Sequence, residues 1–151
     1  MADGPAMRHD APRGAEPRPE PGVSADDVAF GTTIAPWLAV RDAQEAVDFY
    51  AAAFGAVEEY RLEGDDGRAA VARLSVGGAP FWVQDDPDAS PVAPGIGSVR
   101  MIVSVEDPFA AFERAIAAGA SAVAPVHDEH GWRTGRLTDP FGHDWELSRE
   151  L

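Results

Sequence analysis

The sequence predicts an α+β fold made of two copies of one β-α-β-β-β unit. Strand-like and helix-like segments occur twice in the same order, on either side of a Pro- and Gly-rich stretch at 85–97. Equivalent positions also lie at a nearly constant offset, which is 65 residues from Val40 to Val105 and 64 residues from Gly78 to Gly142. An offset of this size that persists along the chain indicates a duplicated module.

The first unit begins with the apolar run TTIAPWLAV at 32–40, which predicts a strand. A helix is predicted over 42–54, where apolar residues recur at helical spacing. Asp42 is a good N-cap, Glu45 completes a capping box, and Gly55 is the expected stop. Three further strands are predicted at roughly 56–63, 67–76 and 79–84.

The second unit repeats this pattern. The run SVRMIVSV at 98–105 predicts a strand, and a helix is predicted over 107–119. Asp107 is the expected N-cap, Pro108 occupies the first helical position, and Gly119 follows the last turn. The remaining strands are predicted at roughly 120–126, 132–137 and 143–149.

The remaining segments complete the domain plan. Residues 1–30 are predicted to be a flexible tail, because five prolines, three glycines and nine scattered charges leave little apolar surface to bury. The tail could order on a partner subunit through Val23, Val28 and Phe30. The domain is expected at 31–151, with the first module at about 32–84, a linker at 85–97 and the second module at about 98–149.

The composition excludes several classes of function. The net charge is −14, and all 12 basic residues are arginine. Such a chain repels phosphate backbones, so we expect no nucleic-acid partner. A cationic small molecule would be attracted, although solubility alone also explains the charge. The chain lacks cysteine, an apolar membrane span and a secretory signal, and we therefore expect a cytoplasmic protein.

Three stretches carry a family resemblance: WLAVRDAQEAVDFYAAAFGA, VSVEDPFAAFERAIAAGA and GRLTDPFGHDWEL. With the repeat, they resemble the vicinal oxygen chelate superfamily over about residues 32–149. This superfamily includes glyoxalase I, fosfomycin and bleomycin resistance proteins and extradiol dioxygenases. The PhnB-like, glyoxalase/bleomycin-resistance type is the most similar. The resemblance implies two βαβββ modules that form a curved mixed sheet around a cleft, and it implies a homodimer.

The resemblance also implies four metal-ligand positions, two in each module. In this sequence they are Ala35, Trp82, Arg100 and Glu146. Only Glu146 has lone pairs for a divalent ion, and the arginine cation would repel one. Because a catalytic zinc site needs about three protein ligands, we expect no metal and no cofactor here.

Strand alternation predicts what replaces the metal. Arg100 and Glu146 should point to the same side, where a guanidinium and a carboxylate can form an ion pair. Independent solvation of the two side chains is the alternative. The ligand-binding cleft is predicted to contain seven residues: Trp37, Trp82, Gln84, Arg100, Ser104, Trp132 and Glu146. Indole faces favour flat or cationic ligands, although both indoles could instead be core residues.

Weaker candidates lie near the second module's strands. The charged stretch at 127–136 contains His127 and His130, which could bind a metal but are more simply exposed. The resemblance suggests that this stretch, with Trp132, is a loop bordering the cleft as a lid. His143 is expected to pack beside Trp145.

Three functions remain open at this point. The first is a metal-free protein that binds or sequesters a small organic molecule. The second is an enzyme, which would use Glu146 with a relocated metal at His127 or His130, or use Arg100 to stabilise an oxyanion and Glu146 as a general base. The third is an accessory domain whose cleft is filled by its own side chains.

Overall fold

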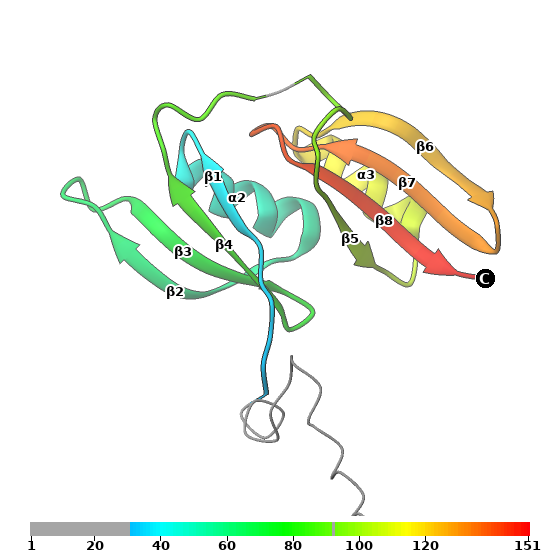
Figure 1. Cartoon of the computed structure of the whole chain (residues 1–151), viewed down its shortest axis with the longest axis horizontal. Coiled ribbons are helices and arrows are strands. Elements are labelled where there is room, and N and C mark those ends of the chain that lie inside the picture. The colour runs from blue at the N-terminus through cyan, green and yellow to red at the C-terminus, as the bar shows by residue number, and fades with distance from the viewer. Residues whose placement is uncertain (1–30, 92) are drawn as a thin grey trace, which may run out of the picture. The chain divides into compact units, whose positions relative to one another are not determined.

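The structure is a computed structural model that describes residues 31–91 and 93–151. The predicted tail at 1–30, with Val23, Val28 and Phe30, lies outside the described residues. Two four-stranded mixed sheets and two helices make up the compact unit Ala35–Leu151 (Figure 1). The α+β prediction of two βαβββ modules is confirmed.

The first module contains one helix and four strands, in the strand order β1-β4-β3-β2. Its elements are β1 (Trp37–Val40), α2 (Ala43–Phe54), β2 (Val57–Glu63), β3 (Ala69–Val76) and β4 (Ala79–Asp85). Strand β1 pairs in parallel with β4, and the other neighbours are antiparallel.

The predicted strand at 32–40 is too long, because pairing begins only at Trp37, opposite Trp82. Pro36 has no amide hydrogen to donate to a neighbouring strand. Ile34 is 97% exposed and therefore has no sheet to pack against.

The second module repeats this arrangement in the order β5-β8-β7-β6. Its elements are β5 (Arg100–Ser104), α3 (Pro108–Ala118), β6 (Ser121–Glu129), β7 (Trp132–Thr138) and β8 (Asp144–Glu150). Register supports the duplication, since Trp37 pairs with Trp82 and the equivalent Ile102 pairs with Glu146.

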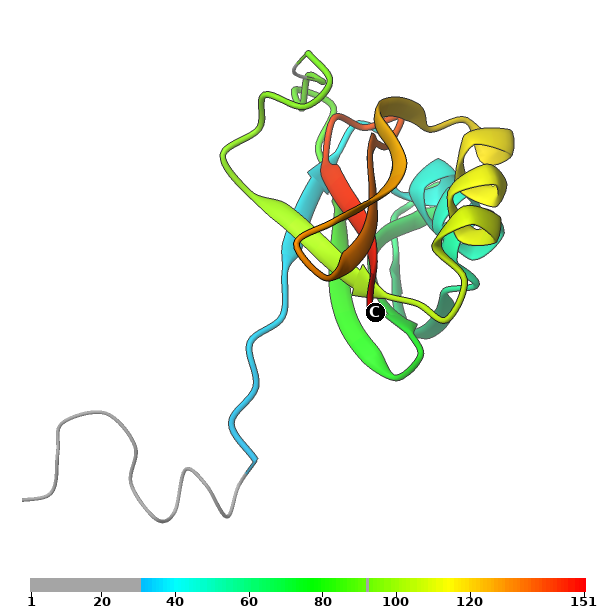
Figure 2. The same cartoon turned by 90° about the vertical axis from the view of Figure 1, so that its right-hand side faces the viewer.

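Both helices begin and end where the sequence predicts. The Asp42 carboxylate accepts from the Glu45 amide at 3.0 Å, and Asp107 accepts from the Ala110 amide at 3.1 Å. Gly55 ends α2 with a φ of 68°. Helix α2 packs on β3 and β4, and α3 packs on the second sheet, so one face of each sheet is covered by its helix (Figure 2).

A buried carboxylate joins the two modules. Asp139 is 4% exposed and accepts hydrogen bonds from the Tyr50 hydroxyl and, at 2.8 Å, from the Trp145 indole. Its other oxygen accepts from the amides of Phe141 and His143. Burial, followed by the charge of Asp139, raises the pKa of Tyr50 well above its ordinary value.

Two expected positions near the second sheet differ in the structure. His143 is not part of strand β8, which begins at Asp144. It precedes the strand, and its Nε2 lies 2.9 Å from the Ala39 carbonyl oxygen. The stretch 127–136 is a hairpin rather than a loop, because β6 and β7 continue to a tight turn at His130 and Gly131, both with positive φ.

Candidate functional site

Two tryptophans stack on the face of the first sheet that α2 leaves uncovered. The rings of Trp37 and Trp82 have centroids 5.5 Å apart and planes 21° apart. Their parallel pairing brings them side by side, since they are partners in the β1–β4 register. Trp37 is 54% exposed, so this pair is a surface feature rather than core filling.

Three polar or aromatic side chains surround the two indoles. The Trp37 indole donates to Gln84 Oε1 at 2.8 Å. The Arg73 guanidinium lies 5.6 Å from the Trp82 ring centroid, and the Tyr60 ring meets Trp82 at an angle of 62°. We call these five residues the indole group: Trp37, Tyr60, Arg73, Trp82 and Gln84.

The predicted ion pair is present on the second sheet. Arg100 Nε lies 2.6 Å from Glu146 Oε2, and the Thr134 hydroxyl donates to Glu146 Oε1 at 2.6 Å. The Glu146 side chain is 14% exposed and that of Arg100 is 40% exposed. Both carboxylate oxygens of Glu146 are therefore engaged. We call Arg100, Thr134 and Glu146 the ion-pair group.

The other predicted cleft residues lie on the same face as the ion-pair group. Ser104 is exposed at the end of β5, and Trp132 is 44% exposed at the start of β7. Within residues 31–91 and 93–151, no hydrogen bond, ion pair or ring contact joins the indole group to the ion-pair group. The predicted residues thus lie on two sheets, with Trp37, Trp82 and Gln84 on the first and the other four on the second.

The two histidines of the β6–β7 hairpin both have local partners. His127 Nδ1 lies 2.9 Å from the Pro125 carbonyl oxygen, and its Nε2 lies 3.1 Å from Glu129. These two contacts, the carbonyl first, raise the pKa of His127 above its ordinary value. His130 is almost fully exposed at the hairpin turn.

The sequence of residues 35–148 matches the family described as "Glyoxalase-like domain". This match covers both modules and both groups of residues. The chain belongs to this glyoxalase-like family, within the vicinal oxygen chelate superfamily.

Relatives of this glyoxalase-like chain include proteins known by sequence and by structure. The uncharacterized protein Mb0911c from Mycobacterium bovis is 38% identical over 126 residues, which are 78% of this chain and 83% of the relative. The crystal structure of TioX from Micromonospora sp. ML1 is 33% identical and has a TM-score of 0.64, covering 80% of this chain and 100% of that chain.

A more distant structure shows the fold alone. The fosfomycin resistance protein FosX from Listeria monocytogenes is 18% identical, with a TM-score of 0.61. The match covers 80% of this chain and 94% of that chain.

The superfamily's metal does not fit the equivalent positions of this glyoxalase-like chain. Ala35 and Trp82 have no lone pairs, and Arg100 directs a cation at Glu146, the one remaining candidate ligand. Across residues 31–91 and 93–151, no three His, Asp or Glu side chains gather in a way that could hold a metal. A metal at these four positions would therefore have one side-chain ligand, Glu146.

Sequence reasoning missed Tyr60, Arg73 and Thr134, which directly contact predicted residues. The signal was the alternation along β2, β3 and β7, which places these side chains on the uncovered faces. Alternation alone, however, does not say which residue lies opposite which. That information requires the register across hairpins, where a bulge on β2 shifts the pairing.

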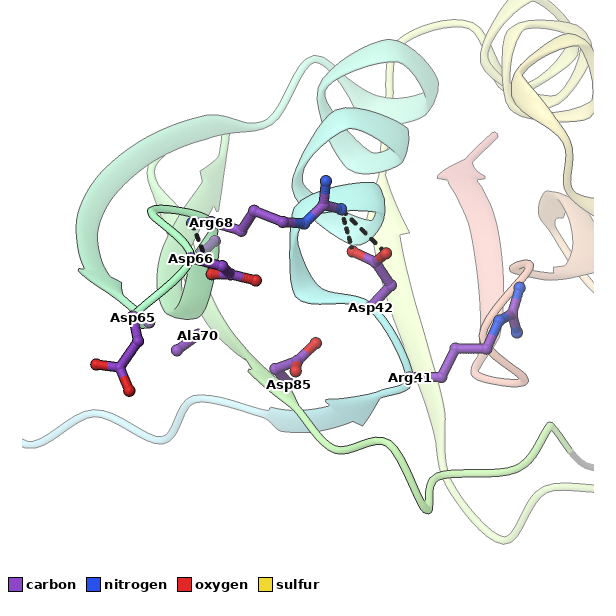
Figure 3. A pocket seen from close by; sticks show the side chains of 9 residues that line it. Arg41, Asp42, Asp65, Asp66, Arg68, Ala70 and Asp85 are labelled. Atoms are coloured by element: carbon purple, nitrogen blue, oxygen red, sulfur yellow. Dashed lines mark hydrogen bonds and ion pairs between the residues drawn. The ribbon is translucent and has the colours of Figure 1, made fainter.

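A separate surface pocket of about 450 Å³ lies where β1 meets α2, beside the β2–β3 turn (Figure 3). Four aspartates line it, but three already have structural roles. Asp42 caps α2 and pairs with Arg68, Asp66 accepts from the Arg68 amide, and Asp85 accepts from the Ala43 amide. The side chain of Asp65 points away from the others. Turn and cap formation explain this cluster.

Proposed function

We propose that this protein binds a small organic molecule without a metal, on the uncovered sheet faces that carry the indole group and the ion-pair group. The observation that carries the proposal is the exposed, stacked pair of Trp37 and Trp82. Large aromatic side chains left on a surface mark ligand or partner sites. A ligand with a flat ring suits them, because aromatic rings stack favourably in offset, parallel arrangements.

Polar groups around the indoles would orient such a ligand. The Gln84 amide still has two N–H donors after it accepts from Trp37. Apolar walls with a few fixed polar groups are typical of small-molecule sites. The strong net negative charge favours a cationic ligand at long range, so flat and cationic compounds are both candidates.

A homodimer is part of the proposal. Several large apolar side chains on the uncovered faces remain exposed: Val57 at 62%, Leu62 at 52% and Ile102 at 61%. Exposed apolar patches on a monomer usually mark an interaction site. A second copy of the chain bound at these faces would remove the patch from water.

The experiment is a binding screen with matched pairs of compounds. Flat aromatic compounds and saturated analogues of the same size are added to the purified protein, and tryptophan fluorescence and thermal shift are recorded. We expect the flat member of a pair to bind and the saturated member to bind at least about tenfold more weakly, because only the flat ring stacks.

Two variants complete the screen. Trp37→Ala should abolish binding with little loss of stability, because the side chain is half exposed. Phe109→Ala, which removes a half-exposed ring from α3, is the matched control. Equal binding of flat and saturated compounds would contradict the proposal, and no binding by any compound would favour an accessory domain.

An enzyme is the second candidate, favoured by the ion pair at two of the superfamily's ligand positions. In this reading Arg100 would stabilise an oxyanion and Glu146 would act as general base, or Glu146 would join a relocated metal. A stoichiometric amount of metal in the purified protein, absent from the Glu146→Gln variant, would establish the metal-dependent enzyme. Turnover by metal-free protein that Glu146→Gln abolishes would establish the other.

The cytoplasmic location and the PhnB-like subtype remain predictions. The absence of cysteine supports the first. Among the described residues, neither helix has the length and apolar character to cross a bilayer. Fractionation of the source cells would test the location.

A further inference from the structure

The duplication places one arginine at the same point of each sheet. Arg73 on β3 pairs in register with Trp82, and Arg136 on β7 pairs with Glu146. Trp82 and Glu146 are equivalent positions of the two modules, so Arg73 and Arg136 are equivalent as well. Residues opposite each other in a sheet lie on the same face, which is here the uncovered one.

The two arginines differ in what they contact. Arg73 lies against the Trp82 ring, with Nε 3.0 Å from Glu59 Oε2, so its charge has a counterion. The Nε atoms of both arginines are buried and have no hydrogen-bond acceptor within residues 31–91 and 93–151, but Arg136, unlike Arg73, also has no ion-pair partner there. A buried cationic group that lacks both is costly, which makes Arg136 an unfilled position rather than a neutral one.

The residue beside each arginine also differs. Tyr60 pairs with Arg73 in the first sheet, whereas Ala124 pairs with Arg136 in the second. A methyl group stands where the other module has a phenol ring. The residue paired with Arg136 is therefore much smaller than the residue paired with Arg73.

Two carboxylates of β8 on the same face as Arg136 already have other partners. Glu146 is held by Arg100 and by the Thr134 hydroxyl. Asp144 is 4% exposed and accepts from the amides of Gly95 and Gly97 and from Thr138. Arg136 therefore has neither a hydrogen-bond partner nor an ion-pair partner among the described residues.

We propose that Arg136 is an oxyanion subsite, which binds a carboxylate or phosphate group of the small molecule. This inference rests on the proposed binding function and names the chemical class of the ligand: a flat ring for the indole group and an anionic group for Arg136. Guanidinium groups bind both oxyanions through paired hydrogen bonds. The local charge thus opposes the preference for cations that the net charge of −14 suggests.

The direct test uses inorganic phosphate as the probe. The Nε–Hε resonances of the arginines are recorded by NMR on isotope-labelled protein while phosphate is added at constant ionic strength. Arg136→Lys identifies the resonance by its disappearance. We expect the Arg136 signal to shift with saturation, while the signal of Arg149, which binds the Glu106 carbonyl oxygen, does not. No shift at Arg136 would overturn the proposal.

A second measurement separates this subsite from the indole group. Naphthoate, naphthyl phosphate and the neutral naphthalenemethanol are compared by fluorescence titration. We expect both anions to bind more tightly than the alcohol, and Arg136→Gln to weaken only the anions, by about tenfold or more, as for the loss of a charge-assisted hydrogen bond. Arg149→Gln makes the same charge change without this effect.

The remaining outcomes are also decisive. Binding of the alcohol with no preference for the anions, together with no phosphate shift at Arg136, would overturn the subsite and leave the proposed function intact. Failure of all three naphthyl compounds, with a phosphate shift at Arg136, would overturn the flat-ring function and support the subsite. If Arg136→Gln instead dissociates a dimer in sedimentation and leaves anion binding unchanged, Arg136 pairs with a second copy and the proposal is wrong.

Discussion

At the scale of single residues, Asp139 concentrates the buried polar contacts of the core. It accepts from one phenol, one indole and two backbone amides, and it is nearly sealed from water. A buried carboxylate is stable only when donors replace its hydration. Removal of any one donor should therefore destabilise the fold, because the Asp139 carboxylate would stay buried with one hydrogen bond fewer.

Tyr50→Phe tests this expectation. The substitution keeps the ring, which packs fully buried against Phe81 and Trp145, and deletes only the hydroxyl. We expect the free energy of unfolding to fall by about 1–3 kcal/mol, the usual penalty for a buried polar group that loses its partner. Urea denaturation measures it. Tyr60→Phe is the control, since that ring is 48% exposed, and a similar loss there would contradict the explanation.

At the scale of elements, each helix is fixed by contacts at its start and along its covered face. Asp42 begins α2 with a cap and also pairs with Arg68 at 3.0 Å. The Glu45 amide first, and Arg68 after it, lower the pKa of Asp42 below its ordinary value of 3.8. The charged form is thus favoured in the folded chain.

This pKa shift makes stability depend on pH. Because the folded pKa is lower than the unfolded one, the contribution of Asp42 is present above about pH 3.8 and is lost as the pH falls through the folded value. NMR titration of the Asp42 carboxyl should give a pKa below 3.8. Arg68→Gln should raise it only in part, because the amide is the larger cause. If Arg68→Gln returned the pKa of Asp42 fully to its ordinary value of 3.8, the hydrogen bond from the Glu45 amide would contribute nothing to the shift.

Close packing of α3 on its sheet depends on Gly135. A Cβ at this position would lie 2.7 Å from a methyl carbon of Val126 and 2.9 Å from Phe112 of α3. Both neighbours are partly buried side chains, so they can move only at a cost. The helix therefore lies directly against the β7 backbone.

Gly135→Ala should lower the free energy of unfolding by about 1–3 kcal/mol, as overpacked cores do. Chemical denaturation gives the value. Adding Val126→Ala to the same chain should restore part of the loss, because it removes the closer contact. A Gly135→Ala protein as stable as the parent would show that α3 does not pack as described.

At the scale of the whole molecule, the proposed dimer would use the uncovered faces of the sheets. The exposed Leu62 and Ile102 lie on different sheets, each away from its helix. We expect a concentration-dependent dimer in sedimentation, weakened by Leu62→Gln without a change in the unfolding of the monomer. Glu63→Gln, the exposed neighbour of Leu62 in β2, is the control. A monomer at every concentration would contradict the dimer.

The sequence was sufficient for features that depend on nearby residues. Asp42, Asp107 and the glycines that follow the helices mark both helices correctly, because caps act within one turn. The ion pair of Arg100 and Glu146 also followed from the sequence, since the duplication offset and strand alternation put both side chains on one face.

Features that depend on distant pairing could not be predicted. The true start of β1 is set by where β4 can pair with it, not by the apolar character of 32–40. The position of Arg136 opposite Glu146 and Ala124 depends on the registers of two hairpin pairs, one of them irregular. The hydrogen bond from Tyr50 to the Asp139 carboxylate likewise forms only when both modules have packed together.

That last contact has a consequence for how the duplicated chain can be divided. The phenol of Tyr50, the Ala39 carbonyl and the Ala53 carbonyl belong to the first module, yet each bonds to the second. A polypeptide cut in the linker would yield two halves, and each half would lack hydrogen-bond partners that the other half supplies. Neither should fold by itself, and mixing them should regenerate the native core by fragment complementation.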